Sequence, residues 1–188
     1  MTFTVIPIRS FQGMSRMATV LDAEARRQLM ARLAAHTVAI SLAAGSSVTT
    51  VTGDPEVGAW AQGLGITVIP EPEGGGLDAA ARAGVEAAKG RPWLVLHADL
   101  PLLEPNDITA VVEAARGGFA LAPSHDGGTS AIVGTTSDFP FRYGPGSLRR
   151  HLAAVAGRAT VVNRPGFGAD VDRPSDLDWL RVLDTAVR

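Results

Sequence analysis

The sequence predicts an α/β fold in which a mostly parallel sheet forms the middle of three layers, with helices on both faces. Short apolar segments rich in β-branched residues alternate along the chain with longer segments of helical periodicity. The run Trp93–His97 (WLVLH) is apolar almost throughout, which is typical of a strand buried on both faces. No repeat or linker divides the 188 residues, so we expect a single domain over 1–188.

The first half of the chain shows these alternating elements clearly. Leu29, Leu33 and Ile40 recur at helical spacing behind Asp22, a residue type that favours the N-cap, and predict the longest helix over 22–43. The other expected elements here are strands over 3–8, 47–52 and 66–69, a helix from the turn at 53–55 through 62, a glycine-rich loop over 73–78 and an alanine-rich helix over 79–89.

The second half has shorter and weaker signals. We expect strands over 93–97, 119–122, 130–133 and 160–162, helices over 106–116 and through 154, and a last helix after Asp172. The short strands in this half could supply an antiparallel element to the sheet.

Composition excludes several classes of function. With 17 basic and 19 acidic residues the net charge is -2, so there is no basic surplus for nucleic acid or an anionic membrane. The chain has no cysteine, which removes disulfides, thiolate metal sites and a cysteine nucleophile. It shows neither a signal-like start nor an apolar stretch of the ~20 residues that span a bilayer. We therefore expect a cytoplasmic protein with no nucleic-acid or membrane partner.

Polar loops that follow the predicted strands are the candidate site, because ligands of open α/β sheets bind beyond the carboxyl ends of the strands. Arg9, Ser15 and Arg16 follow the first strand and could bind phosphate oxygens, although solvated surface arginines would give the same pattern. Neither a Walker loop nor a G-x-G-x-x-G motif is present.

Three aspartates are candidate ligands of a divalent cation. Asp99 follows the Trp93–His97 strand, and alternation would place Asp170 and Asp172 on one side of their segment. Mg²⁺ takes hard oxygen ligands and commonly needs only one or two carboxylates beside waters and substrate phosphates. The alternative is that Asp172 caps a helix that has Pro174 in its first turn; for Asp172 alone this is the favoured interpretation.

Histidines and serines give no sign of a hydrolase. His97 and His125 could act as bases and Ser130 and Ser147 as nucleophiles, but no triad or G-x-S-x-G pattern surrounds them.

Several segments together carry a family resemblance that extends over essentially the whole chain. They are the strand and arginine loop at the N-terminus, Gly75–Ala80, His97–Leu103, Gly127–Ala131, Tyr143–Ser147 and Asp170–Leu177. With these segments the chain resembles the guanylyltransferases of coenzyme F-420 biosynthesis, which act on 2-phospholactate or phosphoenolpyruvate. Single pieces such as the ADLPLL run also occur in the wider group that includes molybdenum cofactor guanylyltransferases.

The resemblance implies a fold of the nucleotidyltransferase (Rossmann-like) type and a Mg²⁺-dependent transfer from GTP to a small phosphoacid, with release of pyrophosphate. A homodimer is a further option. Carried over by position, the metal ligands would be Asp99, Asp170 and Asp172, and the catalytic residues Asp99, Arg9 and Arg16. The acceptor would contact Thr129, Gly144 and Ser147, and the nucleotide would border Gly75, Gly76, Leu77 and Asp78.

The first loop departs from the family pattern. Members of the family that this chain resembles usually carry lysines where this sequence has Arg9 and Met14. Of these two residues, only Arg9 keeps a positive charge. Two alternatives therefore stand beside the main interpretation. One is a catalytically impaired or redirected homologue that binds nucleotide, and the other is a nucleotidyltransferase for another acceptor, such as 3-phosphoglycerate, molybdopterin or a sugar phosphate.

Overall fold

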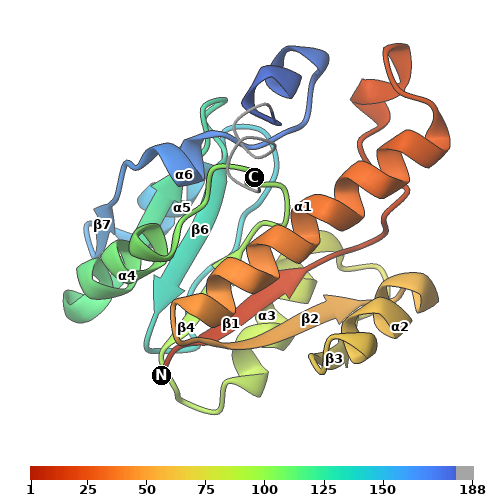
Figure 1. Ribbon diagram of the computed structural model, residues 1–188. Helices are drawn as coiled ribbons and strands as arrows, with labels where there is room; N and C mark the ends of the chain where they lie inside the picture. The colour runs from red at the N-terminus through yellow and green to blue at the C-terminus, as the bar shows by residue number, and fades with distance from the viewer. Residues whose placement is uncertain (181–188) are drawn as a thin grey trace.

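The computed structural model describes residues 1–180, and in it one sheet lies between two layers of helices (Figure 1). The strands are β1 (Phe3–Pro7), β2 (Ser47–Thr52), β3 (Thr67–Pro70), β4 (Trp93–Leu96), β5 (Phe119–Pro123), β6 (Thr129–Gly134) and β7 (Ala159–Val161), in the order β3-β2-β1-β4-β6-β5-β7. Strand β6 runs antiparallel to both of its neighbours, and the other neighbouring strands pair in parallel. The predicted fold class is confirmed, including its antiparallel element.

The helices begin where the sequence supplies caps. They are α1 (Ala23–Ala43), α2 (Pro55–Gly63), α3 (Gly76–Ala87), α4 (Pro105–Ala114), α5 (Ser147–Val155) and α6 (Pro165–Gly168), with 3₁₀ turns η1 (Ser15–Thr19), η2 (Ala115–Gly117) and η3 (Pro174–Trp179). The Asp22 side chain accepts the Ala25 N–H, so the predicted cap of the longest helix is confirmed. Asp54 caps α2 in the same way, followed by Pro55 in the first turn.

Alternation along the strands builds two apolar cores, one on each face of the sheet. Ile6 and Leu94 point into the core beneath α1, α2, α4 and α6. Their neighbours Val5 and Trp93 point into the opposite core, which α3 and α5 cover. Burial on both faces explains why the central strands are apolar without polar interruption.

Two segments differ from the sequence prediction. Helix α3 begins at Gly76, so this residue, Leu77 and Asp78 form its first turn and are not part of the preceding loop. After Asp172 the described chain forms the short turn η3, whose N-cap residue is Arg173, and the Asp176 carboxylate accepts the N–H groups of Asp172 and Arg173. The cap interpretation of Asp172 is therefore wrong. The rest of the expected last helix falls in 181–188, outside the described residues.

No helix within residues 1–180 is long and apolar enough to cross a bilayer.

Candidate active site

One edge of the sheet collects the polar loops. Strands β1, β3, β4 and β5 run in the same direction, and their ends lead to Arg9, Glu71, Asp99 and Asp126 respectively. Because β6 is antiparallel, it begins at this edge, with Thr129. The topology thus brings together side chains that lie more than a hundred residues apart in sequence.

The three aspartates singled out from the sequence lie together at this edge. The Val171 N–H donates to the main-chain carbonyl of Asp99 over 3.0 Å, which fixes the 170–172 segment beside the end of β4. Asp99 is partly buried, and its Oδ1 is shielded from solvent and has no hydrogen-bond partner among the described residues. Burial, followed by the negative charges of Asp170, Asp172 and Asp126, raises the pKa of Asp99 to about 7. An additional positive charge would stabilise this cluster.

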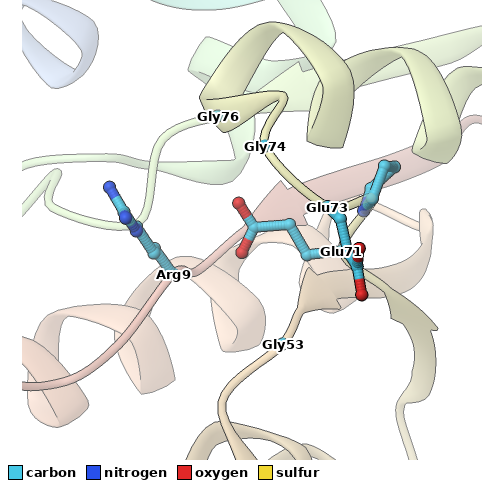
Figure 2. Close-up of a pocket in the computed structure, with 7 residues that line it drawn as sticks. Arg9, Gly53, Glu71, Glu73, Gly74 and Gly76 are labelled. Carbon is cyan, nitrogen blue, oxygen red and sulfur yellow. The ribbon is translucent and has the colours of Figure 1, made fainter.

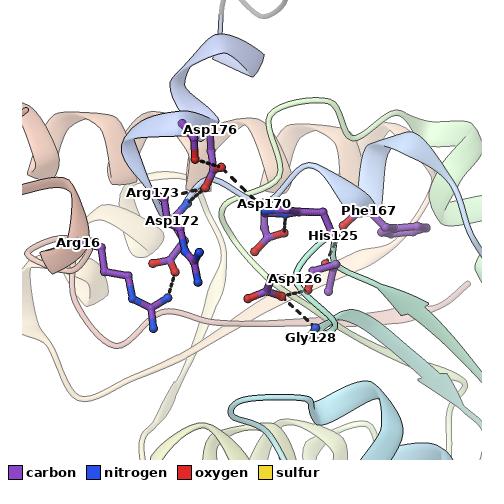
Figure 3. A network of polar contacts seen from close by, with 12 residues as sticks. Arg16, His125, Asp126, Gly128, Phe167, Asp170, Asp172, Arg173 and Asp176 are labelled. Atoms are coloured by element: carbon purple, nitrogen blue, oxygen red, sulfur yellow. Dashed lines mark hydrogen bonds and ion pairs between the residues drawn. The ribbon is translucent and has the colours of Figure 1, made fainter.

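Asp170 and Asp172 have different partners, as Figure 3 shows. The Asp170 carboxylate lies 3.0 Å from Nδ1 of His125. The His125 ring packs edge-on against Trp179. Burial raises the pKa of Asp170 even though His125 acts in the opposite direction. The Asp172 carboxylate forms an ion pair with Arg16. An arginine of the first loop therefore reaches the acidic cluster directly.

These residues fit a magnesium ion that is shared with a substrate. Within residues 1–180 no three His, Asp or Glu side chains form a ready-made metal cage. Mg²⁺ does not require one, because it retains waters and binds substrate phosphates. The unpartnered Oδ1 of Asp99, surrounded by negative charge, is the atom that such a cation would satisfy.

A first pocket, called the Arg9 pocket, has a volume of about 400 Å³ (Figure 2). Its lining residues are Arg9, Gly53, Glu71, Pro72, Glu73, Gly74 and Gly76. A Cβ added at Gly53 would lie 3.9 Å from Oε2 of Glu71. The Glu71 carboxylate therefore lies next to the part of the pocket wall that Gly53 forms without a side chain. The Arg9 pocket combines a guanidinium group and carboxylates with space left by glycines.

The predicted nucleotide residues have three different placements. Gly76 lines the Arg9 pocket, with a backbone φ of 57°, and Leu77 follows it in the first turn of α3. A Cβ at Gly75 would overlap the Ala79 methyl group, so glycine there permits the tight entry into the helix. Asp78 accepts the Tyr143 N–H over 2.7 Å and joins α3 to the loop before α5. Asp78 therefore has a structural partner already.

A second pocket, called the Arg16 pocket, has a volume of about 360 Å³. It is lined by Arg16, Asp126, Gly128, Gly144, Pro145, Gly146 and Arg173. Of the predicted acceptor residues, Gly144 lines it directly. Thr129 and Ser147 are buried one residue beyond Gly128 and Gly146, with their hydroxyl oxygens 3.0 Å apart. Gly144 thus lines a cavity that carries two guanidinium groups, whereas Thr129 and Ser147 lie buried next to lining residues.

Sequence reasoning did not select Arg173, Asp126, Glu71 or His151. Asp126 follows β5 as Asp99 follows β4, so the rule of strand ends could have found it. Glu71 follows β3 in the same manner, and Arg173 directly follows the Asp170–Asp172 motif. His151 lies on α5 and left no local signal, because its partners come from other segments.

Met14 contributes an apolar contact to the fold and no charge to the site. It has a left-handed backbone, with φ of 57°, and its side chain packs beside the small apolar cluster of Met17, Leu33 and Val171. The only Lys of the chain, Lys89, lies beyond the other end of α3. Position 14 therefore offers no cation, and arginines provide the positive charge of both pockets.

An open α/β sheet with pockets and an acidic cluster at the carboxyl ends of its strands is typical of nucleotide-binding enzymes, and the comparisons with known proteins identify the chain as a nucleotidyltransferase. The chain belongs to the MobA-like NTP transferase domain family, whose model matches residues 16–165. Within that family it groups with phosphoenolpyruvate guanylyltransferases. The protein of that name from Rhodococcus erythropolis is 36% identical over 95% of this chain and 89% of its own length. The one from Rubrobacter xylanophilus is 36% identical over 93% and 91%.

Solved structures support the fold. A nucleotidyl transferase from Methanothermobacter superposes with a TM-score of 0.72 at 23% identity, covering 100% of this chain and 98% of its own. The 4-diphosphocytidyl-2C-methyl-D-erythritol synthase from Anaerococcus prevotii does so with a TM-score of 0.63 at 6% identity, covering 100% and 97%. At these identities the likeness concerns the architecture alone.

Proposed function

We propose that this enzyme transfers GMP from GTP to the phosphate of a small phosphoacid and releases pyrophosphate, with Mg²⁺ as its cofactor. Phosphoenolpyruvate is the first candidate acceptor and 2-phospho-L-lactate the second, and the product would enter coenzyme F-420 biosynthesis. The observation that carries the proposal is the pairing of two arginine-lined pockets with an acidic cluster at one edge of the sheet. The names of the relatives support the choice of phosphoenolpyruvate.

The chemistry requires positioning and charge neutralisation above all. An oxygen of the acceptor phosphate forms a bond to the α-phosphorus of GTP, the bond from that phosphorus to the bridging oxygen breaks, and pyrophosphate leaves. The attacking oxygen is already ionised at neutral pH, so no general base is needed. Arg9 and Arg16 would donate to the phosphates of the two anionic reactants. Mg²⁺, held by Asp99 with Asp170 or Asp172, would neutralise charge on the triphosphate.

The Arg9 pocket suits guanine in particular. Guanine presents two adjacent donors, its N1–H and 2-amino group, and a carboxylate can accept from both at once. Glu71 places such a carboxylate over Gly53. Adenine presents an acceptor at N1 and would leave a carboxylate facing a lone pair. We therefore assign guanine reading to Glu71.

The test is pyrophosphate release by the purified protein with GTP and Mg²⁺, with phosphoenolpyruvate, 2-phospho-L-lactate or 3-phosphoglycerate supplied separately. We expect release that depends on one of the first two acids and ceases when the acid is omitted. Release independent of any acid would contradict the proposal. Release with 3-phosphoglycerate alone would keep the reaction and change the acceptor.

A second candidate is a nucleotide-binding homologue with impaired catalysis, and the apolar packing of Met14 favours it. This alternative expects GTP binding without turnover on any of the three acids. Met14→Lys would then restore turnover, because a charged contact to a phosphate contributes ~1.5–3 kcal/mol, roughly 10- to 100-fold. If the wild type is already active, the substitution should have a much smaller effect.

A further inference from the structure

His151 is a buried histidine that the proposed reaction does not use. It lies on α5 with none of its surface exposed. Its Nε2 accepts the Arg142 N–H over 2.8 Å, and its Nδ1 lies 3.0 Å from Oγ1 of Thr129. Burial, together with the charges of Arg150 and Arg142, lowers the pKa of His151 to about 4 although Asp78 opposes this. The ring is therefore neutral at physiological pH.

The backbone fixes which nitrogen carries the proton. A neutral imidazole has one N–H donor and one acceptor nitrogen. An N–H donates to Nε2, so Nε2 must be the acceptor and the proton must be on Nδ1. The Nδ1–H then donates to Thr129 Oγ1. The main chain of Arg142 thus determines the direction of a side-chain hydrogen bond in another part of the fold.

Counting protons shows the consequence for the two hydroxyl groups. Nδ1–H, the Thr129 hydroxyl and the Ser147 hydroxyl supply three protons, and the contacts that join these three groups use two of them. One hydroxyl proton is left without an acceptor among the described residues. If Nε2 carried the proton instead, Thr129 would donate to Nδ1 of His151 and Ser147 would donate to Thr129. Neither hydroxyl proton would then remain free for a ligand.

The two hydroxyl groups are buried and do not line the Arg16 pocket themselves. Thr129 directly follows Gly128, and Ser147 directly follows Gly146, and these two glycines, which have no side chains, form the part of the pocket wall next to the hydroxyl pair. An oxyanion there requires donors and would be repelled by a lone pair. The tautomer of His151 therefore decides whether the hydroxyl pair attracts or repels an anion.

We propose that His151 is a positioning residue that orients the Thr129–Ser147 hydroxyl pair as a donor toward the anionic acceptor in the Arg16 pocket. The inference rests on the proposed function for the identity of the acceptor. It does not rest on that function for the tautomer, which belongs to the free protein.

Two substitutions at position 151 separate donation from packing. His151→Asn places an amide N–H near the position of Nδ1 and keeps a donor for Thr129, whereas His151→Leu removes it. We expect His151→Leu to raise the KM for phosphoenolpyruvate by about 10-fold with the KM for GTP unchanged. His151→Asn should stay within about 3-fold of the wild type. His36→Leu is the matched control, since His36 is a partly buried histidine on α1 that bonds the Leu103 carbonyl away from these pockets, and it should change neither KM.

Equal losses in the Asn and Leu variants, or parallel rises of both KM values, would overturn the positioning role. A long-range ¹H–¹⁵N correlation spectrum of the free wild-type protein tests the tautomer without any substrate, with the His151 signals identified by their loss in His151→Asn. We expect protonated Nδ1 and unprotonated Nε2; the reverse pattern refutes the inference even in an active enzyme. If the wild type turns over no acid, the proposed function fails, and calorimetric titration with phosphoenolpyruvate replaces the kinetic comparison. Equal binding by the wild type and His151→Leu would then refute the role.

Discussion

We expect the Asp99 carboxylate to be required for activity and, at the same time, to lower the stability of the fold. Asp99 is partly buried, its solvent-shielded Oδ1 has no partner among the described residues, and the negative charges of three other aspartates raise its pKa. Asp99→Asn removes the negative charge and keeps the shape. We expect it to abolish acid-dependent pyrophosphate release and, without Mg²⁺ at pH 8, to raise the free energy of unfolding by roughly 1 kcal/mol or more. Enzyme assay and chemical denaturation measure the two effects.

Asp138 provides the matched control for that prediction. Its exposed carboxylate accepts from the Thr136 hydroxyl and pairs with Arg158, so Asp138→Asn should bring no gain in stability and leave activity intact. A loss of stability in Asp99→Asn would show that its carboxylate has a favourable partner in the fold.

Glu71 should determine the choice of base. Inosine triphosphate lacks only the 2-amino group of GTP, so the ratio of kcat/KM for the two nucleotides reports that contact. We expect Glu71→Gln to reduce the preference for GTP by roughly 10-fold, because a hydrogen bond to a charged acceptor is lost. Glu73→Gln, in the same pocket, should keep the preference. If the two variants exchange these results, Glu73 is the residue that reads the base.

Candidate site residues could be selected from the sequence where they follow a strand end or belong to a motif. Asp99, Asp170 and Arg9 were selected in this way, and the structure places them at one edge of the sheet, while their roles stay predictions. His151 was not predictable, because its importance depends on Arg142 and Thr129, which only the folded chain brings to it. For Asp172 a helix cap was weighed against a metal ligand, because Asp followed closely by Pro is common helix-start chemistry; in the structure the N-cap residue is Arg173, and Asp176 accepts the N–H groups of Asp172 and Arg173.

At the scale of elements, the entry into α3 links local conformation to the nucleotide site. Gly76 combines a positive φ with a place in the wall of the Arg9 pocket. Gly76→Ala should lower stability by about 1 kcal/mol, since a side chain disfavours this backbone region, and raise the KM for GTP without changing that for the acid. Steady-state kinetics and thermal unfolding measure these effects.

Gly58 in α2 is the control for that substitution. A Cβ there would meet nothing within 4 Å, and the backbone is helical, so Gly58→Ala should stabilise the protein by about 0.5–1 kcal/mol and leave both KM values unchanged. A rise in the KM for GTP in this variant would mean that the effect at Gly76 is not local to the pocket.

The boundaries of the elements were harder to predict than their existence. The alanine-rich segment predicted α3 correctly, but glycines indicated a loop where the helix already begins. At Gly75 a side chain would overlap Ala79, and at Gly76 it would strain a backbone of positive φ; both causes lie in the three-dimensional geometry of this turn. A propensity scale treats such glycines as breakers and so places the helix start too late.

At the scale of the whole molecule, the fold was predictable because each central strand is buried on both faces. Ile6 and Val5 belong to opposite cores, and because both faces of the strand are buried, its residues are apolar throughout. The direction of β6 could be expected only as a general possibility, since a short apolar segment pairs in either direction. That reversal matters for function, because it makes the start of β6, with Thr129, part of the edge where the other strands end.

The nucleotide site that we propose at this edge also predicts how ligands should change the stability of the whole fold. A ligand that binds only the folded state at 100 times its Kd stabilises it by about 2.7 kcal/mol, which for a chain of this length raises Tm by roughly 5–10 °C. GTP with Mg²⁺ should produce such a rise, and ATP with Mg²⁺ a much smaller one, because Glu71 faces an acceptor at N1 of adenine. Thermal unfolding with each nucleotide, in the wild type and in Glu71→Gln, measures this rise in Tm.

Equal rises in Tm with GTP and ATP would refute base reading by Glu71. No rise with either nucleotide would refute this edge of the sheet as a nucleotide site. A rise with GTP in a protein that turns over none of the acids would leave the impaired homologue as the explanation, since binding would survive where catalysis does not.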